Sequence, residues 1–229
     1  MNISKRLETI GKLVPENKKI VDIGCDHALL SIYIYLYKFP LKVIASDINI
    51  NALKQGKLNI KKYNLDNKII TKVGNGLETI KNEDIDTIII SGLGSKKIID
   101  ILNNDISLLK NVEYILVQPN NNVYQLRKAI TQMGFYIETE KLIKENKIIY
   151  TIILFKKGIK KYNKNELYFG PILFNTYNKL FLELYNQKIK KYTKIYNKIP
   201  SIYLKQKLYY KYKIRFINKN ISIYKKRNQ

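Results

Sequence analysis

The sequence predicts an α/β protein with a doubly wound, Rossmann-like sheet that ends in an antiparallel hairpin and is followed by an all-α extension. Three observations predict this arrangement. Between residues 18 and 133, short runs rich in Ile and Val alternate with helix-length segments, which is typical of a parallel sheet covered on both faces. Residues 134–155 contain two apolar runs with no helix between them. After Gly158, apolar residues recur at helical spacing.

The first part of the chain is expected to contain parallel strands separated by helices. Each expected strand is a continuous apolar run bounded by turn residues, as strands buried on both faces are. The strands are predicted at 18–24, 42–47, 68–74, 86–92 and 113–119. The helices are predicted at 29–36, 49–63, 96–102 and 123–133. Strand–helix units repeated in this way form a doubly wound sheet.

The two apolar runs at 134–143 and 147–155 lie on either side of Lys144-Glu145-Asn146. This pattern predicts an antiparallel hairpin that completes the sheet. A parallel sheet that ends in such a hairpin is typical of class I methyltransferases, whereas dinucleotide-dependent dehydrogenases usually continue with parallel strands. The hairpin therefore favours the methyltransferase arrangement.

Residues 1–158 are expected to form one domain, and residues 159–229 a coiled-coil-like module of two amphipathic helices. Residues of this module recur at spacings of three and four: Leu173, Tyr177, Leu180 and Leu184, then Tyr192, Ile195 and Ile199, and later Leu204, Leu208, Lys211 and Arg215. Pro200 interrupts the pattern, so the two helices are predicted to fold back on each other at 197–201. The pattern suits a projecting hairpin and a docked one equally well.

The chain is strongly basic, since 42 Lys and Arg oppose 18 Asp and Glu for a formal net charge of +24. Such a charge indicates an anionic partner such as nucleic acid. Codon bias in an A/T-rich genome is the alternative, because 38 of the 42 basic residues are lysines. However, residues 156–229 hold 20 basic residues and only two acidic ones, a net charge of +18, which leaves +6 for residues 1–155. Codon bias acts on both parts alike, so the asymmetry favours a basic binding module at the C-terminus.

Composition excludes several other classes of protein. Hydrophobic residues make up 45% of the chain, which is too many for a disordered protein. One Cys and one His exclude a disulfide scaffold and an ordinary structural zinc site, so no metal is expected. The start MNISKRLETIGK has no apolar signal segment, and no stretch approaches the roughly 18 apolar residues of a membrane span. We expect a soluble, cytoplasmic, monomeric protein with no membrane partner.

The first predicted strand ends in Asp22-Ile23-Gly24-Cys25-Asp26-His27. A dinucleotide fingerprint needs three glycines so that the backbone can approach a pyrophosphate, and only Gly24 is present, so NAD and FAD are disfavoured. S-adenosylmethionine has no phosphate and needs one tight turn with polar groups around its methionine part. Asp22 and Asp26 suit the ammonium group, and N–H groups at the start of the next helix suit the carboxylate. His27 is expected to be a structural hydrogen-bonding residue beside the cofactor.

The second and third strands also end in residues that suit this cofactor. Asp47 can accept hydrogen bonds from both hydroxyls of an adenosine ribose, and Ile48 beside it can pack on the adenine face. Asn75, next to Gly76, can both donate to and accept from the adenine edge. The alternatives are a helix N-cap for Asp47 and a plain turn for Gly74-Asn75-Gly76.

The fourth strand ends in Ser91-Gly92-Leu93-Gly94, where small residues allow the cofactor and a target base to meet. A simple strand stop is the alternative for Ser91-Gly92. Each of these alternatives is as good as the functional interpretation of its own position. Four such positions at successive strand ends, where these folds bind ligands, favour a ligand site.

The motifs SKRLETIGKLVP, VDIGCDHALL, ASDIN, GNGLETI, ISGLGS and VQPN, in this order, resemble the bacterial tRNA (adenine-22-N1)-methyltransferase family. The resemblance covers about residues 1–158, and the basic helical part fits the coiled-coil-like extension of that family. The family often has Tyr and Pro where this chain has Leu29 and Ser31, and a second Gly where Ser95 stands. The resemblance implies transfer of a methyl group from S-adenosylmethionine to N1 of an adenine in the D-arm region of tRNA.

The residues agree with this chemistry by exclusion. Cys25 lacks the Pro-Cys context of the nucleophile that methylation of a pyrimidine C5 needs. The fourth strand is followed by Ser-Gly-Leu-Gly rather than the [ND]-P-P-[YFW] motif typical of exocyclic amine methylation. Adenine N1 carries a lone pair and can attack the methyl group directly, so positioning and desolvation are the main demands on the enzyme.

Asp26 is the candidate for accepting a proton or for orienting the adenine N6 group. Gln118 and Asn120 are its candidate hydrogen-bonding partners, and Pro119 would stiffen their loop; a strand-terminating turn is the equal alternative. The basic candidates could bind RNA phosphates, although Lys5 and Arg6 could equally be solvated helix charges. The candidate RNA-binding residues are Lys5, Arg6, Lys190, Lys191, Lys211 and Arg215.

Two other functions remain open from the sequence. One is a methyltransferase of the same fold that acts on another RNA site or on a protein. The other is a non-catalytic, basic RNA-binding protein with a vestigial cofactor fold. The joint presence of Asp22, Asp47 and Asn75 argues against the second.

Overall fold

A computed structural model describes residues 1–227 of the chain, which divides into two compact units, Met1–Tyr168 and Phe169–Gln229. The sequence places the domain boundary earlier, after Gly158, and residues 228 and 229 of the predicted second domain lie outside the described residues. The segment from Gly158 to Tyr168 belongs to the first unit, because the buried side chain of Arg127 bonds to the last two residues of this segment. Nη1 of Arg127 donates to the carbonyl oxygens of Leu167, at 3.1 Å, and Tyr168, at 3.3 Å.

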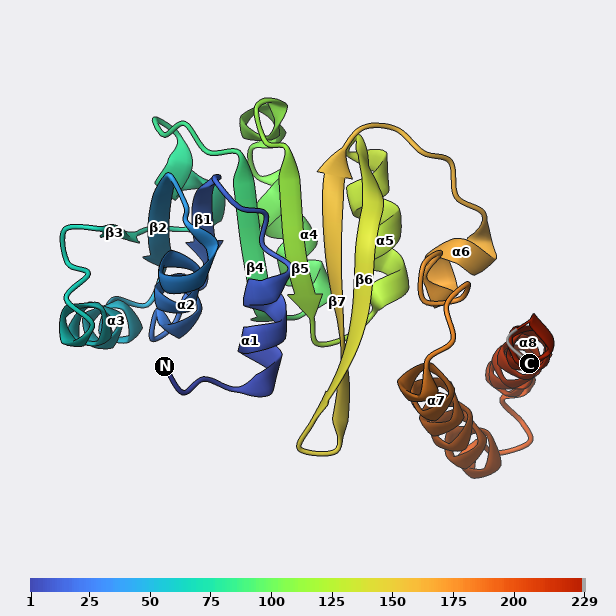
Figure 1. Cartoon of the computed structure of the whole chain (residues 1–229). Coiled ribbons are helices and arrows are strands. Elements are labelled where there is room, and N and C mark those ends of the chain that lie inside the picture. Colours follow the sequence, from blue (N-terminus) through green and yellow to red (C-terminus); the bar gives the residue numbers. More distant parts are fainter. Residues whose placement is uncertain (228–229) are drawn as a thin grey trace. The chain divides into compact units, whose positions relative to one another are not determined.

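The first unit is built on a seven-stranded sheet in the order β3-β2-β1-β4-β5-β7-β6 (Figure 1). The strands are β1 (Lys19–Ile23), β2 (Lys42–Asp47), β3 (Ile69–Val73), β4 (Thr87–Leu93), β5 (Tyr114–Pro119), β6 (Phe135–Glu145) and β7 (Ile148–Lys157). The first five pair in parallel, and β7 pairs antiparallel with both β5 and β6. The predicted doubly wound sheet with a terminal hairpin is therefore confirmed.

The turn of this hairpin lies later than the sequence predicts. Asn146 and Lys147 adopt φ values of 47° and 68°, the left-handed conformation of a two-residue type I′ turn. Asn tolerates this conformation well, and the turn matches the twist of the two strands. Glu145 consequently belongs to β6 instead of the turn.

Helices cover both faces of the sheet, with α1 and α2 in front of it and α4 and α5 behind it in Figure 1. The helices of the first unit are α1 (Lys5–Lys12), α2 (Leu29–Lys38), α3 (Ile50–Lys62), α4 (Ser95–Asn103), α5 (Val123–Gln132) and α6 (Lys164–Phe169), whose last residue begins the second unit. The short 3₁₀ helices are η1 (Gly76–Ile80) and η2 (Ile106–Lys110). The set of predicted helices does not include α1, although Ser4 caps it by accepting from the N–H of Leu7 at 3.3 Å.

The core explains why α1, α2 and α3 share one face of the sheet. Ile10 of α1, Ile32 of α2 and Leu53 of α3 belong to one buried apolar cluster that also contains Ala45 and Leu116 of the sheet. Each of these side chains is at most 2% exposed. These helices pack on the face of the sheet, so the carboxyl ends of its strands remain available for a site.

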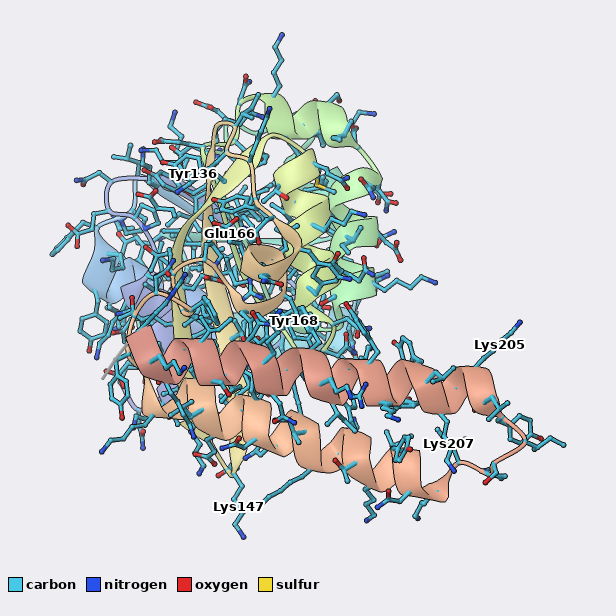
Figure 2. All side chains as sticks on the ribbon, turned by 90° about the vertical axis from the view of Figure 1, so that its right-hand side faces the viewer. Tyr136, Lys147, Glu166, Tyr168, Lys205 and Lys207 are labelled. Atoms are coloured by element: carbon cyan, nitrogen blue, oxygen red, sulfur yellow. The ribbon has the colours of Figure 1, made fainter. Side chains whose placement is uncertain are left out.

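The second unit consists mainly of α7 (Lys179–Lys198) and α8 (Leu204–Arg227), which pack side by side (Figure 2). The predicted pair of helices with a turn near Pro200 is confirmed. The prediction that Leu173 and Tyr177 lie in the first helix was wrong, because Asn178 caps α7 by accepting from the N–H of Leu180 at 2.8 Å.

Aromatic rings hold one end of this helical pair together. Phe181 of α7 stacks on Tyr224 of α8, with ring centroids 4.3 Å apart. The hydroxyl of Tyr224 accepts from the N–H of Asn178, at 2.6 Å, and donates to the carbonyl oxygen of Thr176, at 3.0 Å. The cluster also contains Phe169, Phe174, Tyr185 and Phe216.

Candidate functional site

A cavity of about 470 Å³ lies at the carboxyl ends of the parallel strands in the first unit. Every residue that the sequence assigned to cofactor binding lines it. These residues are Asp22, Gly24, Asp26, His27, Asp47, Ile48, Asn75, Gly76, Ser91, Gly92 and Leu93. The parallel arrangement brings them together because each follows, or ends, a strand that runs in the same direction.

Asp22, in β1, supplies a buried carboxylate to the lining of the cavity. It is 1% exposed, and its Oδ2 accepts a hydrogen bond from the hydroxyl of Ser31 at 2.8 Å. Burial raises the pKa of Asp22 to about 6, because the charged form loses water, and the nearby Asp47 carboxylate adds to the rise while the Ser31 bond opposes it. A positive group placed in this cavity would favour the charged form of Asp22.

The loop after β1 takes a tight path, and most of its backbone N–H groups bond within the protein. Gly24, Asp26 and Ala28 have φ values of 73°, 50° and 56°, so every second residue is in the left-handed region. The N–H groups of Gly24 and Cys25 both donate to the carbonyl oxygen of Ser46, at 2.8 and 3.0 Å. Ala28 is the N-cap of α2, and no described side chain caps that helix. The start of α2 can therefore bind a carboxylate.

Asp47, at the end of β2, holds this loop in place. Its Oδ2 accepts from the N–H of Asp26 at 3.0 Å, and its Oδ1 accepts from the N–H of Asn49 at 2.8 Å. The N-cap of α3 is Asn49, whose side chain accepts from the N–H groups of Asn51 and Ala52. The alternative interpretation of Asp47 as a helix N-cap was therefore wrong, and its carboxylate faces the cavity instead. Ile48 beside it is 65% exposed.

The turn after β3 requires both of its glycines. A Cβ on Gly74 would lie 2.6 Å from Cγ2 of Thr79, and Gly76 has a φ of 59° with Cγ2 of Ile101 at 3.0 Å from such a Cβ. Asn75 between them lines the cavity without capping η1. Lys97 of α4 also lines the cavity, and the sequence pattern had no signal for it because α4 approaches only through the fold.

Asp26 and His27 lie at an accessible part of the cavity. Their side chains are 69% and 51% exposed, and His27 Nε2 lies 3.7 Å from Asp26 Oδ1. The backbone carbonyl of His27 accepts from Nδ2 of Asn59 at 2.9 Å, which ties the loop to α3. Cys25 is buried, and burial together with the nearby carboxylates raises the pKa of its thiol above the ordinary value. A nucleophilic role for Cys25 is therefore disfavoured.

Gln118, Pro119 and Asn120, the other predicted catalytic residues, are absent from the lining of this cavity in the described chain. Gln118 is fully buried; its Oε1 accepts from Nη1 of Arg6 at 2.5 Å, and its Nε2 donates to Oδ1 of Asn120 at 3.2 Å. Nδ2 of Asn120 donates to the carbonyl oxygen of Gly92 at 2.6 Å. Gln118 and Asn120 therefore bond to Arg6 and Gly92, which line the cavity, but do not line it themselves.

Of the predicted RNA-binding residues in the first unit, Arg6 lines the cavity and Lys5 does not. Leu7, the next residue of α1, lines it as well. The sequence could not predict that α1 lies beside the cavity, because the residues that hold Arg6 at the cavity are more than a hundred positions away in the chain.

A family model described as tRNA (adenine(22)-N(1))-methyltransferase matches residues 20–225 of the chain. The chain belongs to this family. The tRNA (adenine(22)-N(1))-methyltransferase of Bacillus subtilis (strain 168) is 28% identical over 205 residues, which cover 87% of this chain and 86% of that relative. The family and the Rossmann-like fold that the motifs predicted are therefore confirmed.

Solved structures agree with membership of the tRNA (adenine(22)-N(1))-methyltransferase family. The structure of M. capricolum TrmK in complex with S-adenosyl-homocysteine, its natural cofactor product, is 32% identical with a TM-score of 0.87 and covers 96% of this chain and 98% of that chain. A Streptococcus agalactiae structure described as a protein of the NADB-Rossmann superfamily is 32% identical with a TM-score of 0.91, over 96% and 97% of the two chains. Both likenesses extend over the two units.

None of the described helices combines the length and the apolar character needed to cross a membrane. No group of three or more His, Cys, Asp or Glu side chains in the described part of the chain could hold a metal ion.

Proposed function

We propose that this protein transfers a methyl group from S-adenosylmethionine to N1 of adenine 22 in tRNA. The observation that carries the proposal is the cavity at the strand ends, where carboxylates, an amide and an apolar side chain come together in a chain of this family. The Bacillus subtilis relative carries this activity in its name, and the M. capricolum structure holds the cofactor product.

The residues present fit S-adenosylmethionine by their chemistry. Asp22 offers a buried carboxylate to an ammonium group, and the uncapped start of α2 offers N–H groups to a carboxylate. Each oxygen of Asp47 already accepts one backbone hydrogen bond and retains a second lone pair for a ribose hydroxyl. Ile48 offers an exposed apolar side chain to a flat adenine ring, and Asn75 offers both a donor and an acceptor to its edge.

Bound there, S-adenosylmethionine supplies an electrophilic methyl group that adenine N1 takes with its own lone pair. No side chain has to form a covalent intermediate, which agrees with the buried thiol of Cys25. The protein has to bring the base into line and exclude water from the reacting atoms. An adenine that is unpaired or mismatched costs least to extract from its stack.

Asp26 is the residue that we assign to the target base. Its backbone N–H is fixed by Asp47, while its carboxylate remains accessible at the cavity. A carboxylate in this place can accept a hydrogen bond from the N6 amine of adenine or take a proton from it. It also stabilises the positive charge that N1 methylation adds to the base.

The second unit is the proposed site of contact with the tRNA backbone. Lys190, Lys191, Lys211 and Arg215 are all exposed on α7 and α8. Near the turn between the helices, Lys205 extends away from the pair (Figure 2). Lysines on an exposed helical surface can neutralise phosphates and release their counterions.

Tyrosines near the same turn differ from those at the other end of the helical pair. Tyr185 and Tyr224 are 2% and 0% exposed within the aromatic cluster, whereas Tyr203 and Tyr209 are 55% and 51% exposed. Exposed rings of this kind can stack on unpaired bases. We therefore propose that the turn end of α7 and α8 contacts RNA, while the clustered end supports the hairpin.

The test is methylation of an unmodified tRNA transcript that carries adenine at position 22, with mapping of the modified nucleotide. We expect 1-methyladenosine at position 22, and no product on a transcript with guanine there. Methylation at another RNA position or of a protein would favour the alternative substrate for this fold. Failure to bind S-adenosylmethionine in a calorimeter would favour the non-catalytic RNA-binding protein.

A further inference from the structure

Arg6 is held at the cavity by residues from three distant strands. Its Nη1 donates to Oε1 of Gln118, in β5, at 2.5 Å. Its Nε lies 3.8 Å from Oε2 of Glu145, at the end of β6, and its backbone N–H donates to Oε1 of the same carboxylate at 3.0 Å. The ring of Tyr150, in β7, has its centroid 5.4 Å from the guanidinium carbon. One amide, one carboxylate and one ring therefore fix the orientation of this arginine.

The guanidinium group of Arg6 can still donate hydrogen bonds to a further partner. Arginine has five N–H donors, and within the described residues Nη2 of Arg6 has no hydrogen-bonding partner. The side chain is 22% exposed and lines the cavity. An arginine that is already oriented loses little conformational entropy when it binds an anion.

The charges around Arg6 indicate which anion it would meet. Asp22, Asp26 and Asp47 line the cavity, and Arg6 and Lys97 are the only Lys or Arg residues in its described lining. An RNA strand that brings a base to this cavity carries phosphates toward those carboxylates, which repel them. A cation at the cavity offsets this repulsion, and the fork of a guanidinium matches the oxygens of a phosphate.

We propose that Arg6 binds the phosphate next to the target adenine of the tRNA, and that Gln118, Glu145 and Tyr150 are positioning residues that aim it there. This inference rests on the proposed function and names the part of the RNA that the site recognises. It also gives Gln118 a role that its complete burial allows, because it acts through Arg6 and does not touch the base.

The network extends from Arg6 to the wall of the cavity. Gln118 donates to Asn120, and Asn120 donates to the carbonyl oxygen of Gly92, which lines the cavity. The same buried amide therefore sets the position of the arginine relative to the end of β4. A shift of Gln118 would move Arg6 relative to the place where the base enters.

The experiment compares matched variants of the full-length protein. Tyr150→Leu removes the ring beside Arg6, whereas Tyr150→Phe keeps the ring and removes only the hydroxyl. Glu145→Gln removes the charge beside Nε and retains an acceptor, and Gln118→Leu removes the buried acceptor. Equilibrium binding of tRNA, KM for tRNA, kcat and calorimetric affinity for S-adenosylmethionine are measured for each, and for each combined with Arg6→Ala.

We expect Arg6→Ala to raise Kd and KM for tRNA at least tenfold, and to lower the slope of log affinity against log salt by about 0.7–0.9. Tyr150→Leu should raise them about threefold to tenfold, and Tyr150→Phe should match the unmodified protein. The affinity for S-adenosylmethionine and kcat should change little. In the Arg6→Ala background the Tyr150 and Glu145 substitutions should have no further effect, because they act through Arg6.

Two results would overturn the inference. In the first, the Tyr150→Leu and Glu145→Gln variants both fold and both bind tRNA as tightly as the unmodified protein. In the second, each of these substitutions lowers tRNA affinity as much in the Arg6→Ala protein as it does when Arg6 is present. Because tRNA binding is measured apart from methyl transfer, a protein that binds tRNA but transfers no methyl group contradicts the proposed function and leaves the test of Arg6 intact.

Discussion

The two units differ in how many carboxylates accompany their lysines. In the first unit, carboxylates pair with Lys12, Lys18, Lys19, Lys38, Lys42 and Lys72. In the second unit, whose sequence from Phe169 onward contains Glu183 as its only acidic residue, tyrosine rings lie under Lys207 and Lys213. A ring quadrupole orients a lysine without neutralising its charge. The first unit has 17 acidic residues against 27 basic ones, a net charge of +10, whereas the much shorter second unit has one acidic residue against 15 basic ones, a net charge of +14. Most of the charge of the second unit is therefore available to a polyanion.

The two units are therefore expected to contribute to function in different ways. In the first unit a few groups act at defined places around one cavity, so that single substitutions have large effects. In the second unit the charge is spread along two helices, so that each residue contributes little and the sum is large. Codon bias in the genome does not explain why 17 of the 18 acidic residues lie in the first unit.

The largest effect is expected when several charges of the second unit are removed together. Replacement of Lys190, Lys191, Lys211 and Arg215 by glutamine should lower tRNA affinity about a thousandfold near 0.1 M salt and reduce the salt slope by about three, if each contacts one phosphate. Filter binding at several salt concentrations measures both. The matched control replaces the ion-paired Lys12, Lys18, Lys19 and Lys38. An equal loss in this control would contradict the difference between the units.

The next effect concerns the single carboxylate assigned to the target base. Asp26→Asn should lower kcat about a hundredfold if the carboxylate accepts a proton. Asparagine suits the variant because the residue has a φ of 50°, which Asn tolerates better than Ala. Single-turnover methylation measures the rate. A rate within a few fold of the unmodified protein would assign Asp26 to orientation of the N6 group instead.

Asp47→Ala should weaken binding of S-adenosylmethionine about tenfold to a hundredfold. Two ribose hydroxyls lose a charged acceptor, which contributes about 1.5–3 kcal/mol. Asp47→Asn should lose less, because an amide oxygen still accepts a hydrogen bond. Titration calorimetry of both folded variants measures the loss. Unchanged affinity in Asp47→Ala would remove Asp47 from the cofactor site.

Binding of S-adenosylmethionine should weaken in acid because of Asp22. Its pKa in the free protein is raised to about 6, and an ammonium partner prefers the charged carboxylate. Affinity should be level above pH 7 and fall up to about tenfold per pH unit below pH 6, as protonation competes with binding. The control is Asp22→Asn, which should bind more weakly at pH 7 and show no such fall. Calorimetry between pH 5 and 8 decides this.

The smallest effect is expected at Cys25, although it lines the same cavity. Cys25→Ser should leave kcat within about twofold, because attack by adenine N1 needs no thiol. A folded Cys25→Ser protein that binds S-adenosylmethionine but is inactive would contradict direct transfer. The Cys25→Ser variant also tests whether any substitution at the cavity lowers activity, or only substitutions of residues with an assigned role.

The strand ends could be predicted because each depends on local sequence. Ile and Val runs that stop at Asp22, Asp47, Asn75 and Ser91 need no information about distant residues to be recognised as strands with polar ends. Parallel pairing then brings those ends to one edge of the sheet. Every predicted cofactor-binding residue consequently lines one cavity. The pair of C-terminal helices could be predicted for the same reason, since helical spacing is a local signal.

The sequence by itself determined the order of strands and helices, the polar strand ends and the separation of charge between the two parts of the chain. Only the tertiary structure decided that Arg6 lines the cavity while Gln118 supports it from behind, because the partners of Arg6 lie 112 and 139 residues away. A hydrogen bond over such a separation leaves no periodic signal in the sequence. It exists because strands from the end of the domain return beside α1, and only the folded chain brings those atoms together.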